Sequence, residues 1–396
     1  MRIAVIGSKG LPPHQGGIEH HCAEIYPRMV EKGYQVDLYA RSSYNEAFQP
    51  KTRLQTRTQS YQGVNVITVP SIRIKGIDAL ACSGLSAAIA LRKPYEIVHF
   101  HALGPSLFTP VTKTFSKAKV LTTCHGLDWQ RAKWGTFSSQ VIKAGERSAV
   151  RFADRLVVVS EALQRYFLQT YGLDATYIEN APVTYAASDR TFRFGRSLGL
   201  EPGKYLLFLG RLVPEKRVDL LLQAFQRLRP QGWKLVLVGD KSDTGAYTAR
   251  LLQVAACDRN IVFTGELRGS TLSEIVRGAG VFVLPSDVEG LPLALLEAMH
   301  EGIPTVASNI PVHSQVLGRD RGLLFKMGDL DDLQDRLGWA MTHPQQMKAM
   351  ARRAKGYVRS HHNWDVITQK YLDLYDSLLN IKSKRLYPVG IGSKLP

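Results

Sequence analysis

The amino-acid sequence predicts an α/β protein made of two Rossmann-like domains in tandem. Its 396 residues are enough for two domains, each with its own core. Short Val/Ile/Leu-rich runs alternate with longer amphipathic stretches, and this alternation restarts after residue 188. Continuous apolar runs separated by helices are typical of parallel sheets that are covered on both faces. The two series of runs therefore predict two parallel sheets.

Each apolar run is a predicted strand, and the longer stretches between the runs are predicted helices. The strands of the first series are RIAVIG, QVDLYA, VNVITV, EIVHFH, KVLTTC and RLVVVS, and those of the second are YLLFLGR, KLVLVGD, IVFTGE, VFVLPS and PTVAS. Because the polar stretch 180–204 separates the two series, we place an N-terminal domain at 1–187 and a C-terminal domain at 195–360. A further helix is predicted at 363–379, and the basic tail 381–396 is predicted to be flexible.

The composition argues against several classes of protein. The four cysteines are scattered without a CxxC pair, which argues against a zinc site or a disulfide framework and favours a reducing cytosol. The longest mostly apolar stretch, 77–91, is shorter than the ~20 residues that a membrane span needs, and the N-terminal apolar run is too short for a signal peptide. The net charge of +17 fits an anionic membrane surface or phosphorylated substrates. We find no RNP-like, zinc-finger or helix-turn-helix motif, so nucleic acid is not a predicted partner.

Two carboxylates separated by seven residues, Glu289 and Glu297, lie in PSDVEGLPLALLEAMHEGIPTVAS, where a strand leads into a turn and a helix. Pro292 suits the first turn of that helix. The free N–H groups and the positive dipole end of the helix favour phosphate, whereas carboxylates suit hydroxyl groups. Such a pair fits the two ends of a nucleotide sugar, although each acid alone is also typical of a solvated surface.

Cations and glycines at two other strand ends fit the same ligand. Arg211 directly follows a strand and Lys216 precedes a helix, in the place where open α/β sheets bind ligands. Arginine clamps phosphate oxygens and lysine acts as a point charge. Gly16 and Gly17 are predicted to open a helix and to let backbone amides approach an anion, although a plain flexible turn is equally compatible.

Three histidines, His99, His101 and His125, stand at the ends of two predicted strands. In a cleft such side chains can hydrogen-bond a sugar hydroxyl or a leaving phosphate, but a lone histidine is more often a polar residue whose hydrogen bonds are satisfied within the protein. His-x-His can also bind metal. Because no clear third ligand is within reach by sequence, no metal site is predicted. The chain has no GxGxxG fingerprint, which argues against a dinucleotide-dependent dehydrogenase.

These motifs together resemble the retaining, GT-B fold glycosyltransferases of family 4, over nearly the whole chain. The resemblance rests on SDVEGLPLALLEAMHEGIPTVAS, which has the family's E-x7-E signature, and on GRLVPEKRVDLLLQAF, TTCHG, GGIE, EIVHFH and VVVSE in the family's order. GSKGLPPHQGGIE also resembles the N-terminal region of rhamnosyltransferase-like bacterial members. The resemblance implies two Rossmann-like domains whose parallel sheets face a central cleft, with helix 363–380 crossing back to the N-terminal domain.

The resemblance also implies roles for individual residues. Arg211 and Lys216 would bind the donor diphosphate and stabilise it as it leaves. Glu297 would hold the ribose hydroxyls, Glu289 would hold the hydroxyls of the transferred sugar, and His125 would lie near that sugar. The further predicted donor contacts are Gly16, Gly17, Gly210, Leu267, Gly290, Leu291, Pro292 and Leu293, and the predicted acceptor contacts are Glu19, His99, His101 and Asn180.

Two departures from the family pattern bear on the expected donor specificity. The common E-G-F-G turn reads Glu289-Gly290-Leu291-Pro292, so that the backbone at Pro292 has no N–H to offer. The usual Asn-Gly after the interdomain strand reads Asn180-Ala181. The family's expected route is front-face substitution, in which positioning and cationic side chains replace a divalent metal.

The sequence therefore predicts a hexosyltransferase without cofactor or metal. Its donor would be a UDP-hexose or, second, dTDP-rhamnose, and its acceptor a saccharide or lipid-linked saccharide of cell-surface polysaccharide, lipopolysaccharide or glycolipid synthesis. We expect it in the cytoplasm, with peripheral contact to the anionic inner face of the membrane left open. A catalytically degenerate module that binds glycans or partner proteins, and a sugar-nucleotide epimerase, remain the alternatives.

Overall fold

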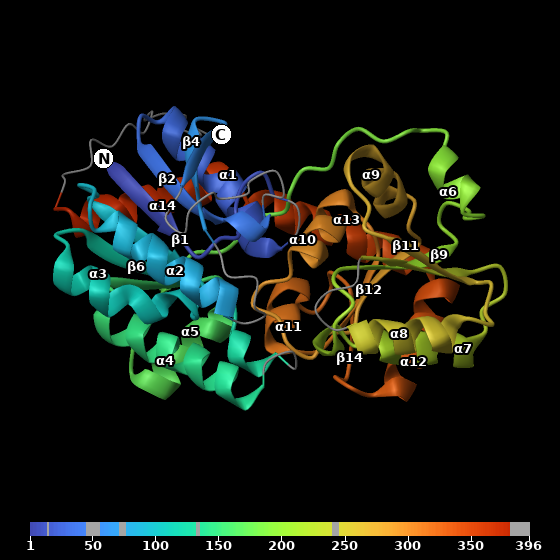
Figure 1. Ribbon diagram of the computed structural model, residues 1–396. Helices are drawn as coiled ribbons and strands as arrows, with labels where there is room; N and C mark the ends of the chain where they lie inside the picture. The colour runs from blue at the N-terminus through green and yellow to red at the C-terminus, as the bar shows by residue number, and fades with distance from the viewer. Residues whose placement is uncertain (14–15, 45–55, 71–76, 132–134, 240–244, 381–396) are drawn as a thin grey trace, which may run out of the picture.

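The computed structural model describes residues 1–13, 16–44, 56–70, 77–131, 135–239 and 245–380. The described chain forms two α/β lobes that lie side by side (Figure 1). An eight-stranded sheet forms the centre of the N-terminal lobe and a six-stranded sheet the centre of the C-terminal lobe. This architecture confirms the predicted fold class. The tail that we predicted to be flexible lies outside the described residues.

The N-terminal sheet has the strand order β3-β4-β2-β1-β5-β6-β7-β8. Its strands pair in parallel except at one edge, where β3 runs antiparallel to β4. The strands are β1 (Arg2–Ile6), β2 (Gln35–Arg41), β3 (Arg57–Tyr61), β4 (Val64–Val69), β5 (Ile97–His101), β6 (Lys119–Cys124), β7 (Arg155–Val158) and β8 (Thr176–Tyr177). The helices of this lobe are α1 (Gly17–Glu31), α2 (Ile77–Ala90), α3 (Thr109–Phe115), α4 (Thr136–Phe152) and α5 (Glu161–Tyr171), with short 3-10 turns η1 (Ser42–Tyr44), η2 (Pro105–Phe108) and η3 (Asp128–Gln130).

Both faces of the N-terminal sheet are buried, as continuous apolar strands require. Side chains alternate along β1, so Ile3 and Val5 pack with α1 and α14 (Trp364–Leu378), whereas Ala4 and Ile6 pack with α2. The chain reaches α14 by crossing back from the C-terminal lobe after α13 (Pro344–His361). The side chain of Asn363 caps α14 by accepting the backbone N–H groups of Asp365 and Val366 over 2.8 and 3.1 Å.

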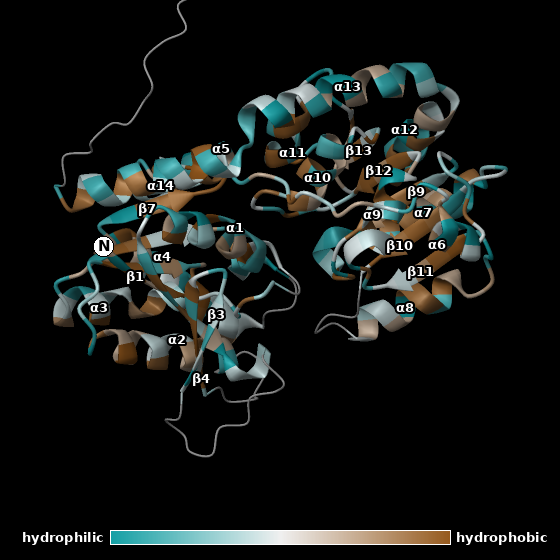
Figure 2. Ribbon diagram, turned by 90° about the horizontal axis from the view of Figure 1, so that it is seen from above, coloured by the Kyte–Doolittle hydropathy of each residue, from teal (hydrophilic) through white to brown (hydrophobic). Residues whose placement is uncertain are grey.

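The C-terminal sheet is entirely parallel, with the order β11-β10-β9-β12-β13-β14. Its strands are largely apolar, and the helices around it carry polar residues on their outer sides (Figure 2). The strands are β9 (Tyr205–Leu209), β10 (Lys234–Val238), β11 (Ile261–Gly265), β12 (Val281–Leu284), β13 (Thr305–Ser308) and β14 (Leu323–Phe325). The helices are α6 (Arg193–Ser197), α7 (Val218–Leu228), α8 (Gly245–Ala255), α9 (Gly269–Arg277), α10 (Leu293–Glu301), α11 (Pro311–Leu317), α12 (Leu330–Thr342) and α13, with the 3-10 turn η4 (Pro214–Lys216).

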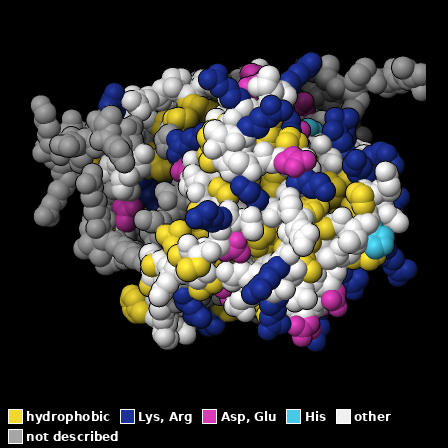
Figure 3. All heavy atoms as spheres, turned by 90° about the vertical axis from the view of Figure 1, so that its right-hand side faces the viewer, with side chains coloured by type: hydrophobic (Ala, Val, Ile, Leu, Met, Phe, Trp, Pro, Cys, Tyr) yellow, Lys and Arg dark blue, Asp and Glu magenta, His cyan; other side chains and the backbone are white. Residues whose placement is uncertain are grey.

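Residues 178–192 join the two lobes without a helix or strand. Arg277 of α9 fixes this connection by donating to the carbonyl of Ala186 over 2.8 Å while pairing with Glu301 over 2.9 Å. On the outer face of the C-terminal lobe, Lys and Arg side chains are scattered among acidic and apolar ones (Figure 3). Among the described residues, no helix is long and apolar enough to cross a membrane.

Candidate active site

An ion pair at the carboxyl ends of β9 and β12 forms the centre of the candidate site. Nζ of Lys216, at the end of η4, bonds to Oε1 of Glu289. The hydroxyl of Ser286 donates to the same oxygen over 2.8 Å. Burial alone would raise the pKa of Glu289, but Lys216, supported by Ser286, reverses this effect and lowers it. Glu289 is therefore an ionised carboxylate, which accepts hydrogen bonds and donates none.

Two arginines from different lobes face this pair. Arg211 follows β9, whereas Arg131 follows η3 in the N-terminal lobe and bonds to Asp128 over 3.0 Å. Burial and the positive charge of Arg131 lower the pKa of Arg211. Asp128 raises the pKa of Arg131, and the charge of Glu289 acts on both guanidinium groups. Sequence reasoning missed Arg131, because nothing in the sequence distinguishes it from the other basic residues of its domain.

The turns that face each other across the lobes touch at glycines. A Cβ atom on Gly290 would clash with the carbonyl oxygen of His125, and one on Gly126 would lie 3.5 Å from the Cα atom of Gly290. The E-G-L-P turn of the C-terminal lobe is therefore in backbone contact with the C-H-G turn of the N-terminal lobe. Position 290 has room only for glycine in this closed arrangement.

Two helix N-termini also meet at this junction. Gly16 caps α1 with φ 103°, Gly17 is the first residue of α1, and a Cβ atom on Gly17 would lie 3.6 Å from Leu293, the first residue of α10. Their free N–H groups and positive dipole ends, together with the cations, favour an anion between the lobes. Pro292 is the N-cap of α10 rather than a residue of its first turn, so our prediction for it was one position off.

Glu297 lies farther along α10 and meets the connection between the lobes. The hydroxyl of Tyr185 donates to its Oε2 over 2.7 Å, and the backbone N–H of Val183 also bonds to the carboxylate. Burial nevertheless raises the pKa of Glu297 to about 7. Near neutral pH this carboxyl group is therefore divided between its ionised and protonated forms. No sequence pattern points to Tyr185, which reaches Glu297 only because of the path of residues 178–192.

The other predicted donor contacts line the same edge of the sheet. Gly210 has φ 155° and directly precedes Arg211, and a Cβ atom there would lie 3.8 Å from Cε of Lys216. Leu291 is buried in the turn before α10. Leu267, just after β11, is partly buried and packs against the core of the C-terminal lobe.

The four predicted acceptor contacts are buried and already engaged. His99 and His101 are wholly buried, Asn180 is 3% exposed and Glu19 is 4% exposed. Glu19 accepts the backbone N–H of Lys9 over 2.9 Å and so orders the loop after β1. The prediction that these side chains touch the acceptor directly does not fit their burial. Alternate residues of a strand share a face, and the face that carries His99 and His101 packs on α1 and α14.

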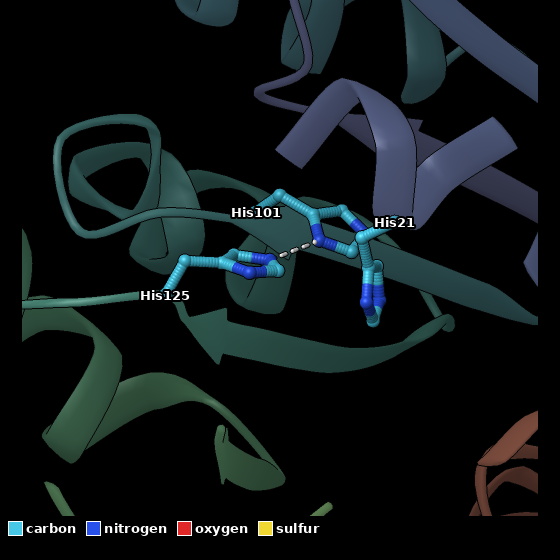
Figure 4. A group of neighbouring side chains, drawn as sticks. All are labelled: His21, His101 and His125. Atoms are coloured by element: carbon cyan, nitrogen blue, oxygen red, sulfur yellow. Dashed lines mark hydrogen bonds between the residues drawn. The ribbon is translucent and has the colours of Figure 1, made fainter. Parts of the chain in front are cut away.

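His21, His101 and His125 form a cluster, with one ring nitrogen from each within 4.8 Å of the others (Figure 4). Nδ1 of His21 bonds to Oδ1 of Asn180 over 2.7 Å, and its Nε2 is buried without a partner. His21 therefore supplies the third imidazole of the cluster, and we did not predict it from the sequence. Zinc bonded to nitrogen at ~2.1 Å in a tetrahedral site needs its ligands roughly 3.4 Å apart. Nδ1 of His101 and Nε2 of His125 are only 2.9 Å apart and bond to each other, so among the described residues the cluster fits a hydrogen-bond network better than a metal site.

The family models agree with this geometry. Residues 15–182 match the model described as Glycosyltransferase Family 4, and residues 190–357 match the model described as Glycosyl transferases group 1. The chain belongs to the GT-B glycosyltransferases of family 4. Each match covers one lobe of this glycosyltransferase, so the candidate site is built from residues of both matched regions.

The individual relatives are distant in sequence but cover nearly the whole chain. The glycosyltransferase is 23% identical to the GDP-mannose-dependent alpha-(1-6)-phosphatidylinositol monomannoside mannosyltransferase of Mycobacterium tuberculosis, over 94% of this chain and 98% of that protein. Sucrose-phosphate synthase from Thermosynechococcus elongatus shares its fold with a TM-score of 0.80 at 20% identity, over 96% and 100% of the two chains. HepE of Anabaena in complex with UDP-glucose does so with a TM-score of 0.77 at 16% identity, over 95% and 99%.

Proposed function

We propose that this glycosyltransferase moves a hexose, with retention of configuration, from a nucleoside-diphosphate sugar to a saccharide or lipid-linked acceptor. The observation that carries the proposal is the Lys216–Glu289 pair beside Arg211, at the edge of the sheet where two helix N-termini converge. Cations and helix dipoles suit the diphosphate, and ionised Glu289 suits sugar hydroxyls. The pathway we propose is the synthesis of a cell-surface polysaccharide, lipopolysaccharide or glycolipid.

The donor we propose first is a UDP-hexose. Its support is the similarity in fold to HepE, whose structure holds UDP-glucose. GDP-mannose is the second candidate, because the name of the mycobacterial relative specifies that donor. In either case the hydroxyls of the ribose would donate to Glu297, and the backbone near Leu267 would receive the base.

The proposed reaction needs no divalent metal. The bond between the anomeric carbon and the diphosphate breaks while the acceptor oxygen bonds to the same face of that carbon. The acceptor's proton passes to the leaving phosphate oxygen. Arg211, Lys216 and Arg131 would stabilise the charge that develops on the diphosphate, and the closed lobes would exclude water.

Calorimetry tests the donor site first. UDP, GDP, ADP and dTDP are titrated without metal into the wild type and Arg211→Ala, and we expect one nucleotide to bind the wild type and to lose at least about tenfold in affinity in the variant. Failure of all four to bind would refute the proposed site.

Sugar transfer is tested next, with nucleotide sugars that carry the same base as the nucleotide that binds. Product formation that requires an acceptor separates a transferase from an epimerase, and the anomeric configuration of the product tests retention. Tight nucleotide binding without any turnover would favour the degenerate binding module instead.

We further propose that a lipid-linked acceptor is met at an anionic membrane surface. α3 ends at exposed Phe115, with Lys113, which pairs with Asp154 over 2.5 Å, in its last turn and Lys117 two residues farther on; exposed Phe137 is the second residue of α4. Aromatic rings enter the interface and lysines are attracted to anionic lipid. Flotation with liposomes should show binding that increases with anionic lipid and decreases in Phe115→Ser/Phe137→Ser. Equal recovery with neutral and anionic liposomes would contradict this step.

A further inference from the structure

A chain of hydrogen bonds runs from the core of the N-terminal lobe to His125, which lies where the two lobes touch. Tyr375 of α14 bonds to Nδ1 of His99 over 2.7 Å, and Nε2 of His99 bonds to Thr123 over 2.7 Å. Tyr26 of α1 bonds to Nε2 of His101 over 2.6 Å. Nδ1 of His101 in turn bonds to Nε2 of His125 over 2.9 Å (Figure 4). The chain therefore links residues of α1, β5 and α14 to the side chain of His125.

The groups in this chain are neutral. Burial lowers the pKa of His99 to about 3 and holds the pKa values of His101 and His125 well below the ordinary range. Burial also raises the pKa values of Tyr26 and Tyr375 well above the ordinary range, so both phenols keep their protons. A neutral imidazole has one N–H donor and one acceptor nitrogen, so each bond that it makes through one nitrogen fixes the role of the other.

The protons can then be placed along the chain. We assign Tyr375 as the donor to Nδ1 of His99, so that Nε2–H of His99 donates to Thr123. The hydroxyl of Tyr26 lies near Tyr375, His99 and His101. Its shortest contact is 2.6 Å to Nε2 of His101, against 3.0 Å to Nδ1 of His99, so we assign its single proton to His101. His101 therefore carries its proton on Nδ1 and donates to Nε2 of His125. The proton of His125 must then be on its Nδ1.

We propose that Tyr26 and His101 are positioning residues that hold His125 in its Nδ1–H form, as a neutral hydrogen-bond donor to the sugar rather than a base. The inference rests on the proposed function, because that function gives the sugar hydroxyls to Glu289, and the neighbouring Gly290 is in backbone contact with His125. Among the described residues none bonds to Nδ1 of His125, and this atom is not one of the described polar atoms that are buried without a partner. His125 is partly exposed, so Nδ1 is open to a ligand.

In this arrangement His125 can donate a hydrogen bond but cannot act as a base. With Nε2 engaged and Nδ1 protonated, His125 has no free lone pair with which to take the acceptor's proton. That proton then goes to the leaving phosphate, as the proposed reaction requires. A hydroxyl of the transferred sugar would accept from Nδ1–H, which orients the anomeric carbon toward the diphosphate.

The direct test is the tautomer of His125, read from nitrogen–proton correlation spectra of the full chain labelled with 15N-histidine, without substrate. The signal of His125 is identified by its loss in His125→Asn. We expect the wild type to show a proton on Nδ1 and Tyr26→Phe to show a mixture of both tautomers. Tyr39→Phe is the matched control, because it removes a buried phenol that bonds to Tyr95 over 3.0 Å on the far side of the sheet. A wild-type proton on Nε2, or an unchanged tautomer in Tyr26→Phe, overturns the proposal.

Turnover gives the second readout. Tyr26→Phe should lower kcat about two- to tenfold with little change in donor KM, since one neutral hydrogen bond loses its preset direction. His125→Asn keeps an N–H group near the position of Nδ1 and should retain more activity than His125→Gln, whose amide reaches the position of Nε2. Equal or greater activity of the Gln variant contradicts the donor role. Because the spectra need no substrate, inactivity with every donor would refute the proposed function without deciding the tautomer.

Discussion

Glu297 provides a test of the site that needs no substrate, because its burial makes folding depend on pH. We predict that Glu297→Gln stabilises the protein, and that the gain increases with pH. The pKa of Glu297 is about 7 in the folded protein, against 4.5 in the unfolded chain. Between these values the folded state binds the proton and the unfolded state does not, so stability falls as the pH rises. Below pH 4.5 both states are protonated and the effect vanishes; above pH 7 the full cost is present.

The magnitude follows from the two pKa values. Their difference of about 2.5, at ~1.4 kcal/mol for each pH unit, corresponds to about 3 kcal/mol, and partial exposure reduces this to about 2–3 kcal/mol at pH 8. At pH 5 the same carboxylate costs less than about 1 kcal/mol. Glutamine does not titrate, and the hydroxyl of Tyr185 can still donate to its amide oxygen. The variant should therefore gain about 5–10 °C in the melting temperature of the C-terminal lobe at pH 8 and little at pH 5.

The assay is thermal unfolding of the wild type and Glu297→Gln at pH 5, 6, 7 and 8, followed by tryptophan fluorescence. Glu201→Gln is the matched control, because it neutralises an exposed carboxylate in the same lobe and should leave the melting temperature unchanged at every pH. An equal shift at pH 5 and pH 8, or a loss of stability at pH 8, would refute the reasoning. In either case Glu297 would not be a buried carboxylate that resists ionisation.

The remaining predictions concern the cations and the contact between the lobes. Lys216→Ala should lower kcat by about 10²-fold, as expected for loss of a cation that stabilises a leaving group, and wild-type turnover would contradict this role. Arg131→Ala should weaken binding of the nucleoside diphosphate by about tenfold but leave binding of the nucleoside unchanged, as calorimetry can show. Gly290→Ala should open the lobes by forcing a Cβ atom against the carbonyl of His125, detected as a larger radius of gyration, whereas Gly356→Ala, which has open space around it, should not. Excess EDTA should leave transfer unchanged, and a loss that Mg²⁺ or Mn²⁺ restores would contradict a metal-free reaction.

The fold could be predicted from the sequence wherever burial produces a continuous apolar run. All the predicted strands are present because a parallel strand covered on both faces must be apolar throughout. The sequence did not reveal β3, β8 or β14. β3 is a mostly exposed, polar edge strand that pairs antiparallel, and β8 and β14 are only two and three residues long. Short or polar edge strands lack the periodicity on which the prediction rests.

In the candidate site, the sequence located charges that stand directly at strand ends, but not their partners from other elements. Glu289 and Lys216 lie in the loops that follow β12 and β9, and a parallel sheet brings the loops after neighbouring strands to one edge. Tyr185 reaches Glu297 from the connection between the lobes, and Arg131 faces Arg211 from the other lobe. These contacts depend on how the two lobes come together, which no local pattern encodes.

Three titratable side chains of the site differ in protonation state, so binding of a donor should affect the proton of each one differently. Glu289 is ionised beside Lys216, His125 is neutral, and Glu297 is divided between two forms at pH 7. Hydroxyl groups that donate to Glu297 would favour its ionised form, because hydrogen bonds to a carboxylate lower its pKa. Donor binding below pH 7 should then release up to one proton. Calorimetry in two buffers of different ionisation enthalpy measures this release, which should disappear in Glu297→Gln. Because Glu289 is already ionised and His125 stays neutral, a release that persists in the variant would have to come from a group outside this set.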